Sequence, residues 1–143
     1  METIVVGVDG SEAAGVALEF AVEESALRGA NLRVISVWDV PVLVQPEIVT
    51  APEVFEGLRD EASIVVAEAV ARANELQPTV SCEGLVLSGR AGDVLIEEAQ
   101  GAVLIVVGRK GHGGLASIFL GSVSRHVADH APCPVVVVPP LGG

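Results

Sequence analysis

The chain is poor in aromatic residues. Of its 143 residues, one is tryptophan, three are phenylalanine and none is tyrosine. A flavodoxin-like electron carrier needs a phosphate loop after its first strand and aromatic walls around the isoalloxazine ring. With Trp38 as the one tryptophan and no tyrosine, the sequence argues against that class of protein.

Cysteine is equally scarce. Cys82 and Cys133 lie far apart, each beside residues predicted to form a strand, and there is no CxxC pair or ligand cluster. Both are therefore expected to be buried, reduced thiols. His126 and His130 lie one helical turn apart, but Asp129 falls off their face and no third ligand is visible, so we interpret them as surface histidines rather than metal ligands.

Positive charge is limited, with 8 Lys and Arg against 19 Asp and Glu and a net charge of -11. This balance argues against a nucleic acid partner, because a phosphate backbone would be repelled. Four cations nevertheless fall between residues 88 and 126 against three acids, and we interpret that stretch either as ordinary solvated side chains or as a receiver for a small anion. The four cations are Arg90, Arg109, Lys110 and Arg125.

Long hydrophobic runs are also missing. No segment approaches the roughly 20 apolar residues that a membrane span needs. The N-terminal residues Met1 to Thr3 carry no basic region, and the apolar run behind them ends by Asp9, which is too short for a signal peptide. The sequence therefore predicts a cytoplasmic protein that does not bind a membrane.

What the chain does have is hydrophobic residues in alternating strand and helix patterns, enough for one domain over residues 1–143. Strands are predicted at 3–8, 31–38, 79–87, 102–107 and 135–138. Helices are predicted at 12–28 and 52–77. A short helix is predicted to follow Asp93 as its N-cap, and a last helix covers 123–131 with Ser122 as its N-cap. Gly15 within the first helix suggests a close approach to the sheet. The pattern predicts an α/β fold, an open five-stranded parallel sheet in the order 3-2-1-4-5 with helices on both faces.

A glycine pattern follows the fourth predicted strand. After the apolar run 102–107 come Gly108, two residues, Gly111, nine residues, Gly121 and Ser122. It is neither a P-loop nor a dinucleotide fingerprint, because no Gly-Lys-Ser/Thr closes it and its glycines cannot form one tight turn. Glycines let the backbone approach an anion, and the first N–H groups of the following helix point at it. The layout favours phosphate binding, and its alternative is a flexible connection before the last helix.

This glycine spacing, the Val-Val-Gly-Val-Asp-Gly-Ser segment at 5–11, Val34 to Trp38, and the Pro-Cys-Pro-Val-Val-Val-Val ending together resemble the ATP-binding subgroup of the universal stress protein family. The resemblance covers essentially the whole chain. It implies a Rossmann-like, adenine nucleotide alpha hydrolase-like fold, and a homodimer formed through the edge strand Val135–Val138.

The resemblance also implies a set of binding residues. Asp9 would lie against the nucleoside, and the backbone of Val37 would contact adenine. Gly108 and Gly111 would wrap the ribose and phosphates, and the phosphate tail would be held by N–H groups and hydroxyls of the following helix start. The remaining members of the implied set are Gly7, Val8, Val107, Gly121, Ser122, Val123 and Ser124. Arg109 departs from the family pattern, since many relatives carry a small polar residue there.

Two functions remain open at this point. The first is a regulatory stress-response protein that binds ATP, with Mg²⁺, and hydrolyses it slowly or not at all, because His112 is the only candidate base near the phosphates. The second is a nucleotide-free, dimeric interaction module of the same fold. A response-regulator receiver is excluded, because no acidic pair accompanies Asp9 and no phosphoacceptor aspartate follows the third strand. Among adenine nucleotides, ATP, ADP, AMP and cyclic forms all remain open.

Overall fold

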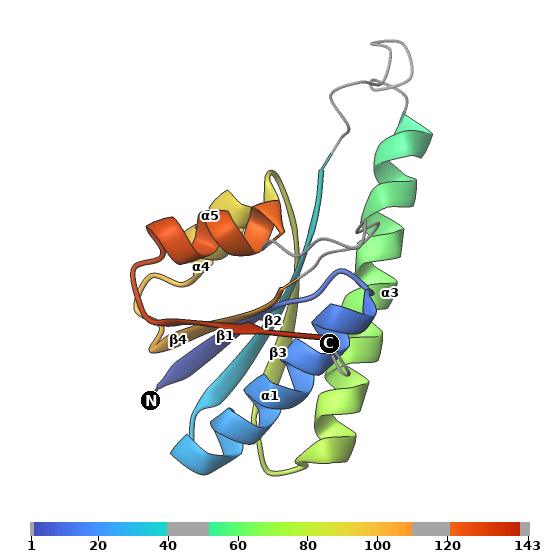
Figure 1. The fold of residues 1–143 in the computed structure, drawn as a ribbon. Coiled ribbons are helices and arrows are strands. Elements are labelled where there is room, and N and C mark those ends of the chain that lie inside the picture. The colour runs from blue at the N-terminus through green and yellow to red at the C-terminus, as the bar shows by residue number, and fades with distance from the viewer. Residues whose placement is uncertain (1, 40–51, 110–120, 141–143) are drawn as a thin grey trace.

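A five-stranded parallel sheet forms the centre of the computed structural model, which describes residues 2–39, 52–109 and 121–140 (Figure 1). Gly111, Lys110 and His112 lie outside these ranges. The strands stand in the order β3-β2-β1-β4-β5, which confirms the predicted order. Their bounds are β1 Thr3–Gly7, β2 Asn31–Trp38, β3 Cys82–Ser88, β4 Leu104–Gly108 and β5 Val135–Val138.

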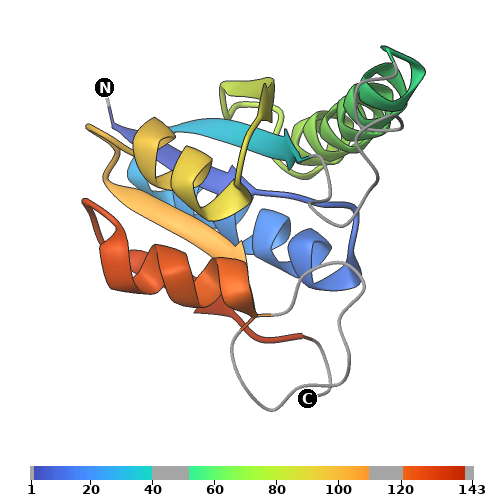
Figure 2. The same ribbon diagram turned by 90° about the horizontal axis from the view of Figure 1, so that it is seen from above.

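Among the described residues, two helices cover each face of the sheet, as Figures 1 and 2 show. Helices α1 (Glu12–Arg28) and α3 (Pro52–Leu76) pack on one face, while α4 (Ala91–Glu98) and α5 (Ser122–His130) lie side by side on the other. Each face therefore has its own hydrophobic cluster. No helix within the described ranges is long and apolar enough to cross a membrane.

The central strands are buried on both faces, as their uninterrupted apolar runs predict. In β1, Ile4 and Val6 join the cluster under α1 and α3, whereas Val5 joins the one under α4 and α5. In β4, Val106 and Ile105 divide in the same way. The edge strand β3 is more exposed, as its Glu83 and Gly84 suggested. It begins at Cys82 rather than at Thr79, because residues 77–80 form a turn in which Val80 N–H donates to the Gln77 carbonyl at 3.1 Å.

Helix α1 has the predicted ends. Ser11 Oγ accepts a hydrogen bond from Ala14 N–H at 3.1 Å, and Gly29 closes the helix with a φ of 68°. The prediction about Gly15 is wrong, because a Cβ placed there would meet nothing within 4 Å. The close approach of α1 to the sheet occurs instead at Gly108, where a Cβ would lie 2.8 Å from the Ala13 carbonyl oxygen.

Two predicted helix caps are also wrong by a few residues. Arg90 is the N-cap of α4, and Asp93 lies within its first turn. Gly121 is the N-cap of α5, and Ser122 is the first helical residue. In both cases the side chain that looks like a cap in the sequence lies just inside the helix, where acidic and short polar residues are also favoured.

The cysteines behave as expected of reduced thiols. Both are free and partly buried, and burial raises the pKa of each thiol, with the Glu83 charge raising the pKa of Cys82 further.

Candidate functional site

A cavity of about 350 Å³ opens at the carboxyl ends of β1, β2 and β4, between the first turns of α4 and α5. This is the point where the chain leaves β1 and β4 in opposite directions, the usual ligand position in open α/β sheets. The residues that line it are Gly7, Val8, Asp9, Ala14, Ile35, Val37, Ala91, Leu95, Val107, Gly108, Gly121, Ser122, Val123 and Ser124.

The cavity brings together the binding residues that the sequence suggested. Ten of the eleven line it, and the eleventh, Gly111, lies outside the described residues. Sequence reasoning missed Ala14, Ile35, Ala91 and Leu95, which enter the cavity from neighbouring elements. One signal was available for Ile35, because it lies two residues before Val37 and so shares its face of β2.

One half of the cavity is apolar. Ile35 and Val37 come from β2, Val107 from β4, and Leu95 reaches over from α4. A Cβ on Gly7 would lie 2.9 Å from Leu95 Cδ1, so the glycine lets the leucine pack directly on the end of β1. Apolar side chains of this kind are typical of the part of a pocket that receives an aromatic ring.

Backbone hydrogen bonds connect Arg109, which follows β4, with β5 and with Gly121 at the start of α5. Arg109 N–H donates to the Val138 carbonyl at 2.9 Å, and Gly121 N–H donates to the Arg109 carbonyl at 2.8 Å. Ser124, a residue that is 2% exposed, has its Oγ 3.0 Å from the Gly121 carbonyl oxygen and 3.3 Å from that of Arg109, and these two acceptors share its single hydroxyl proton. These bonds fix the start of α5 at the end of β4.

The start of α5 places at the cavity backbone N–H groups that have no acceptor within the helix itself. The first bond within this helix is donated by Arg125 N–H to the Gly121 carbonyl at 2.9 Å. The preceding N–H groups, those of Ser122, Val123 and Ser124, therefore have no acceptor within the helix. Because these three residues line the cavity, an anion held there would meet the positive end of the helix dipole.

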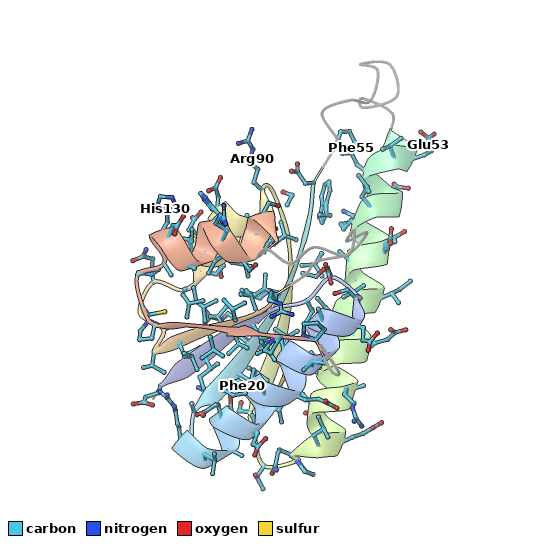
Figure 3. All side chains as sticks on the ribbon, in the orientation of Figure 1. Phe20, Glu53, Phe55, Arg90 and His130 are labelled. Atoms are coloured by element: carbon cyan, nitrogen blue, oxygen red, sulfur yellow. The ribbon has the colours of Figure 1, made fainter. Side chains whose placement is uncertain are left out.

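Asp9 is the one ionisable side chain among the described residues that line the cavity. It is exposed, and its Oδ1 accepts a hydrogen bond from Ser11 N–H at 2.9 Å, which shapes the turn between β1 and α1. Arg90, Arg109 and Arg125, for which the sequence left open either an anion site or ordinary solvated side chains, do not line the cavity. Arg90 points away from the sheet at the start of α4 (Figure 3).

An aromatic contact stands near the same end of the sheet. Trp38, the last residue of β2, meets Phe55 of α3 edge to face, with ring centroids 6.2 Å apart. Figure 3 shows Phe55 near the N-terminal end of α3, beside the end of β2. This contact joins β2 to α3 next to Val37.

The chain is similar in sequence to proteins of one family. The model of the universal stress protein family matches residues 1–139. Universal stress protein Rv1996 from Mycobacterium tuberculosis is 37% identical over 135 residues, which are 94% of this chain and 43% of that protein. A universal stress protein of Mycolicibacterium smegmatis is 35% identical over 141 residues, 96% of this chain and 45% of that protein. The chain thus spans less than half the length of these relatives.

Solved structures agree in fold. The universal stress protein UspA from Lactobacillus plantarum superposes with a TM-score of 0.82 at 28% identity, covering 96% of this chain and 97% of that one. A universal stress protein in complex with cAMP gives 0.72 at 28% identity, covering 96% of both chains. The protein from Archaeoglobus fulgidus in complex with dAMP gives 0.70 at 27% identity, covering 96% and 97%. Sequence, topology and these comparisons together establish that the chain belongs to the universal stress protein family.

Proposed function

We propose that the chain binds an adenine nucleotide in the cavity at the ends of β1 and β4, and that ATP with Mg²⁺ is the nucleotide. The observation that carries the proposal is the convergence, on one cavity, of an apolar half and the N-terminal turn of α5. The relatives in complex with cAMP and dAMP add support, because both ligands contain adenine and a phosphate.

The two halves of the cavity suit the two ends of a nucleotide. The adenine ring would lie on the apolar half, beside the backbone of Val37, and the ribose near Asp9. The phosphates would accept hydrogen bonds from the N–H groups at residues 122–124. Gly108 would let the ribose and phosphates approach the end of β4, since a glycine has no Cβ.

We propose further that the nucleotide acts as a regulatory ligand, with slow hydrolysis or none. Phosphoryl transfer to water needs a positioned nucleophile and charge stabilisation. Asp9, the one ionisable lining residue among those described, lies at the end of β1 rather than at α5. No group of three or more metal-ligating side chains occurs within the described ranges, so Mg²⁺ would depend mainly on phosphate oxygens and water. We also propose that the chain is cytoplasmic, as the sequence predicts.

Isothermal titration of ATP and Mg²⁺ into the purified chain tests the proposal, after mass spectrometry of denatured protein for carried-over nucleotide. Val123 is 37% exposed and lines the cavity at α5, so it offers a matched pair of variants. Val123→Glu places a negative charge beside the phosphates and should weaken binding about tenfold or more. The same change should leave α5 intact, because an acidic residue in the first turn stabilises a helix.

Val123→Gln has nearly the same size without the charge and should stay within about threefold of the wild type. Equal losses of affinity in the two variants would mean that the shape of residue 123, and not its charge near the phosphates, determines nucleotide affinity. Absence of both binding and carried-over nucleotide in the wild type would favour the nucleotide-free interaction module.

We also propose that the chain forms a homodimer through β5. This strand lies at the edge of the sheet, and its four residues are all valine. An unpaired, β-branched edge is a liability for a monomer, because its free backbone groups can pair with another chain.

A further inference from the structure

A second cavity lies between α1 and α3, on the face of the sheet away from α4 and α5. We call it the α1–α3 groove, and its volume is about 200 Å³. Val8 and Ala14 line both this groove and the larger cavity, so the two cavities adjoin the same turn between β1 and α1. The groove is otherwise mainly apolar, with Leu18 from α1 and with Val65 and Ala69 from α3.

Two contacts with α3 bound the groove. At the first, Gly10 lies so close to α3 that an added Cβ would be 3.3 Å from Val65 Cγ2. At the second, Glu19 Oε1 of α1 accepts a hydrogen bond from Arg72 Nη2 of α3 at 3.0 Å. Gly15 lies between these contacts along α1, and a Cβ placed there would meet nothing within 4 Å. A side chain from another molecule can therefore enter the groove beside Gly15.

Carboxylates lie along the groove. Glu68 lines it from α3, and Glu61 lies two turns earlier on the same face of that helix. On α1, Glu12 lies three residues before Gly15 and so on the same face. All three glutamates are exposed, and none takes part in an ion pair within the described part of the chain. The lining cation, Arg72, already contacts two other carboxylates, so the groove presents an excess of negative charge.

This charge narrows the class of molecule that fits the groove. A nucleotide or another anion would be repelled, and a second copy of the chain would bring a further net charge of -11. The volume of about 200 Å³ is below the roughly 300 to 1,000 Å³ of small-molecule sites and suits one apolar side chain. Glu61 and Glu68 lie about 10 Å apart along α3, so a single small cation could not meet both. A polypeptide segment with several basic residues could meet both.

We propose that the α1–α3 groove is the docking surface for a basic segment of a partner polypeptide. One apolar side chain of the partner fills the groove beside Gly15, and its lysine or arginine side chains pair with Glu12, Glu61 and Glu68. The inference goes beyond the proposed function, because docking in this groove requires no nucleotide.

Three synthetic peptides, titrated into ¹⁵N-labelled protein without nucleotide, test the proposal. The first has a central leucine flanked by lysines, the second has serine in place of the leucine, and the third has glutamates in place of the lysines. The first peptide should bind and shift the amides of residues 10–19 and 61–72. The second should bind about tenfold more weakly, because the apolar anchor is missing, and the third should not bind.

Two glycine variants test whether the groove is the site. Gly15→Leu fills the groove with a side chain without changing any charge, and should weaken binding of the first peptide about tenfold. Gly57→Leu is the matched control, because Gly57 is also exposed within a helix, a Cβ there would meet nothing within 4 Å, and it does not line the groove. Its affinity should stay within about twofold of the wild type. Both variants should stay folded, since leucine favours a helix more than glycine does, and circular dichroism checks this.

Equal affinity for the leucine and serine peptides would mean that charge alone attracts them, and would overturn the inference. Unchanged affinity in Gly15→Leu, equal losses in the two glycine variants, or no binding of the first peptide would also overturn it. A lower mass of Gly15→Leu than of the wild type in sedimentation equilibrium would assign the groove to a second copy of the chain instead.

Discussion

At the scale of single residues, two glycines near the start of α1 have opposite physical roles. Gly108 ends β4 against the backbone of α1, where a Cβ would lie 2.8 Å from the Ala13 carbonyl oxygen. Gly15 lies within α1 with open space around its missing side chain. One glycine is needed for packing, and the other only adds flexibility to a helix.

Alanine substitutions at these two positions should therefore change stability in opposite directions. Gly108→Ala should lower the free energy of unfolding by about 1 to 3 kcal/mol, because backbone must move to admit the methyl group. Gly15→Ala should raise it by about 0.5 to 1 kcal/mol, as expected in an exposed helix interior. Urea unfolding followed by circular dichroism gives both values, and a destabilised Gly15→Ala would contradict the open environment described for it.

The residues that line the cavity could be predicted from the sequence at the strand ends and at the glycines. The glycines after β4 could be recognised by their spacing, and the residues at the strand ends were implied by the resemblance to the universal stress proteins. Leu95 and Ala91 could not be found in this way, because they reach the cavity from a helix whose packing on the sheet is decided by the whole fold. The predicted close approach at Gly15 was wrong for a related reason, because the sequence does not show whether a glycine within a helix faces the sheet or the solvent.

At the scale of elements, the start of α5 is held by one buried hydroxyl. Ser124 Oγ bonds the carbonyl oxygens of Gly121 and Arg109 and so fastens the helix to the end of β4. In the proposed site its backbone N–H faces the phosphates, while its side chain has a structural role.

Ser124→Ala should lower the free energy of unfolding by about 1 kcal/mol, since a buried hydrogen bond is lost and two carbonyls lose a donor. Ser122 is exposed, and Ser122→Ala serves as the matched control, with an expected change within about 0.5 kcal/mol. The comparison uses chemical denaturation of both variants under the same conditions. Equal changes would mean that the Ser124 hydroxyl does not hold the helix.

The bounds of helices and strands were predicted correctly where the hydrophobic periodicity and the capping residues indicate the same ends. They were predicted less well where a capping residue lies inside the helix. The bounds of α1 and β2 match the sequence pattern, because Ser11, Gly29 and a continuous apolar run fix them. The starts of α4 and α5 differ by one to three residues, since Asp93 and Ser122 are good cap residues that the fold places inside the helix. The third strand starts late because residues 77–80 form a turn, and its pairing with β2 begins only at Cys82.

At the scale of the whole molecule, the proposed homodimer depends on the outer edge of β5. The Pro134 carbonyl accepts a hydrogen bond from Ile105 N–H of β4 at 3.0 Å, and the Val138 carbonyl accepts one from Arg109 N–H, just after β4, at 2.9 Å. Because backbone groups alternate along a strand, those of Val135 and Val137 are directed to the open edge. A second copy could pair there without disturbing the sheet.

Sedimentation equilibrium at micromolar concentration should give twice the 14.6 kDa chain mass. Val137→Pro removes one outward N–H while leaving the contacts of residues 134 and 138 with β4, and should reduce the mass to that of one chain. Circular dichroism checks that the variant stays folded. A wild-type mass of 14.6 kDa would contradict the proposed dimer.

The claim at the centre of this account is that an adenine nucleotide lies between the end of β1 and the start of α5. Titrating ATP and Mg²⁺ into ¹⁵N-labelled protein and mapping the perturbed amides tests it most directly. The largest changes are predicted at Val8 and Asp9, at Val37, and at residues 121–124, where the N–H groups would meet phosphate. Saturable changes confined to other surfaces, or no changes at all, would contradict the assignment of this cavity.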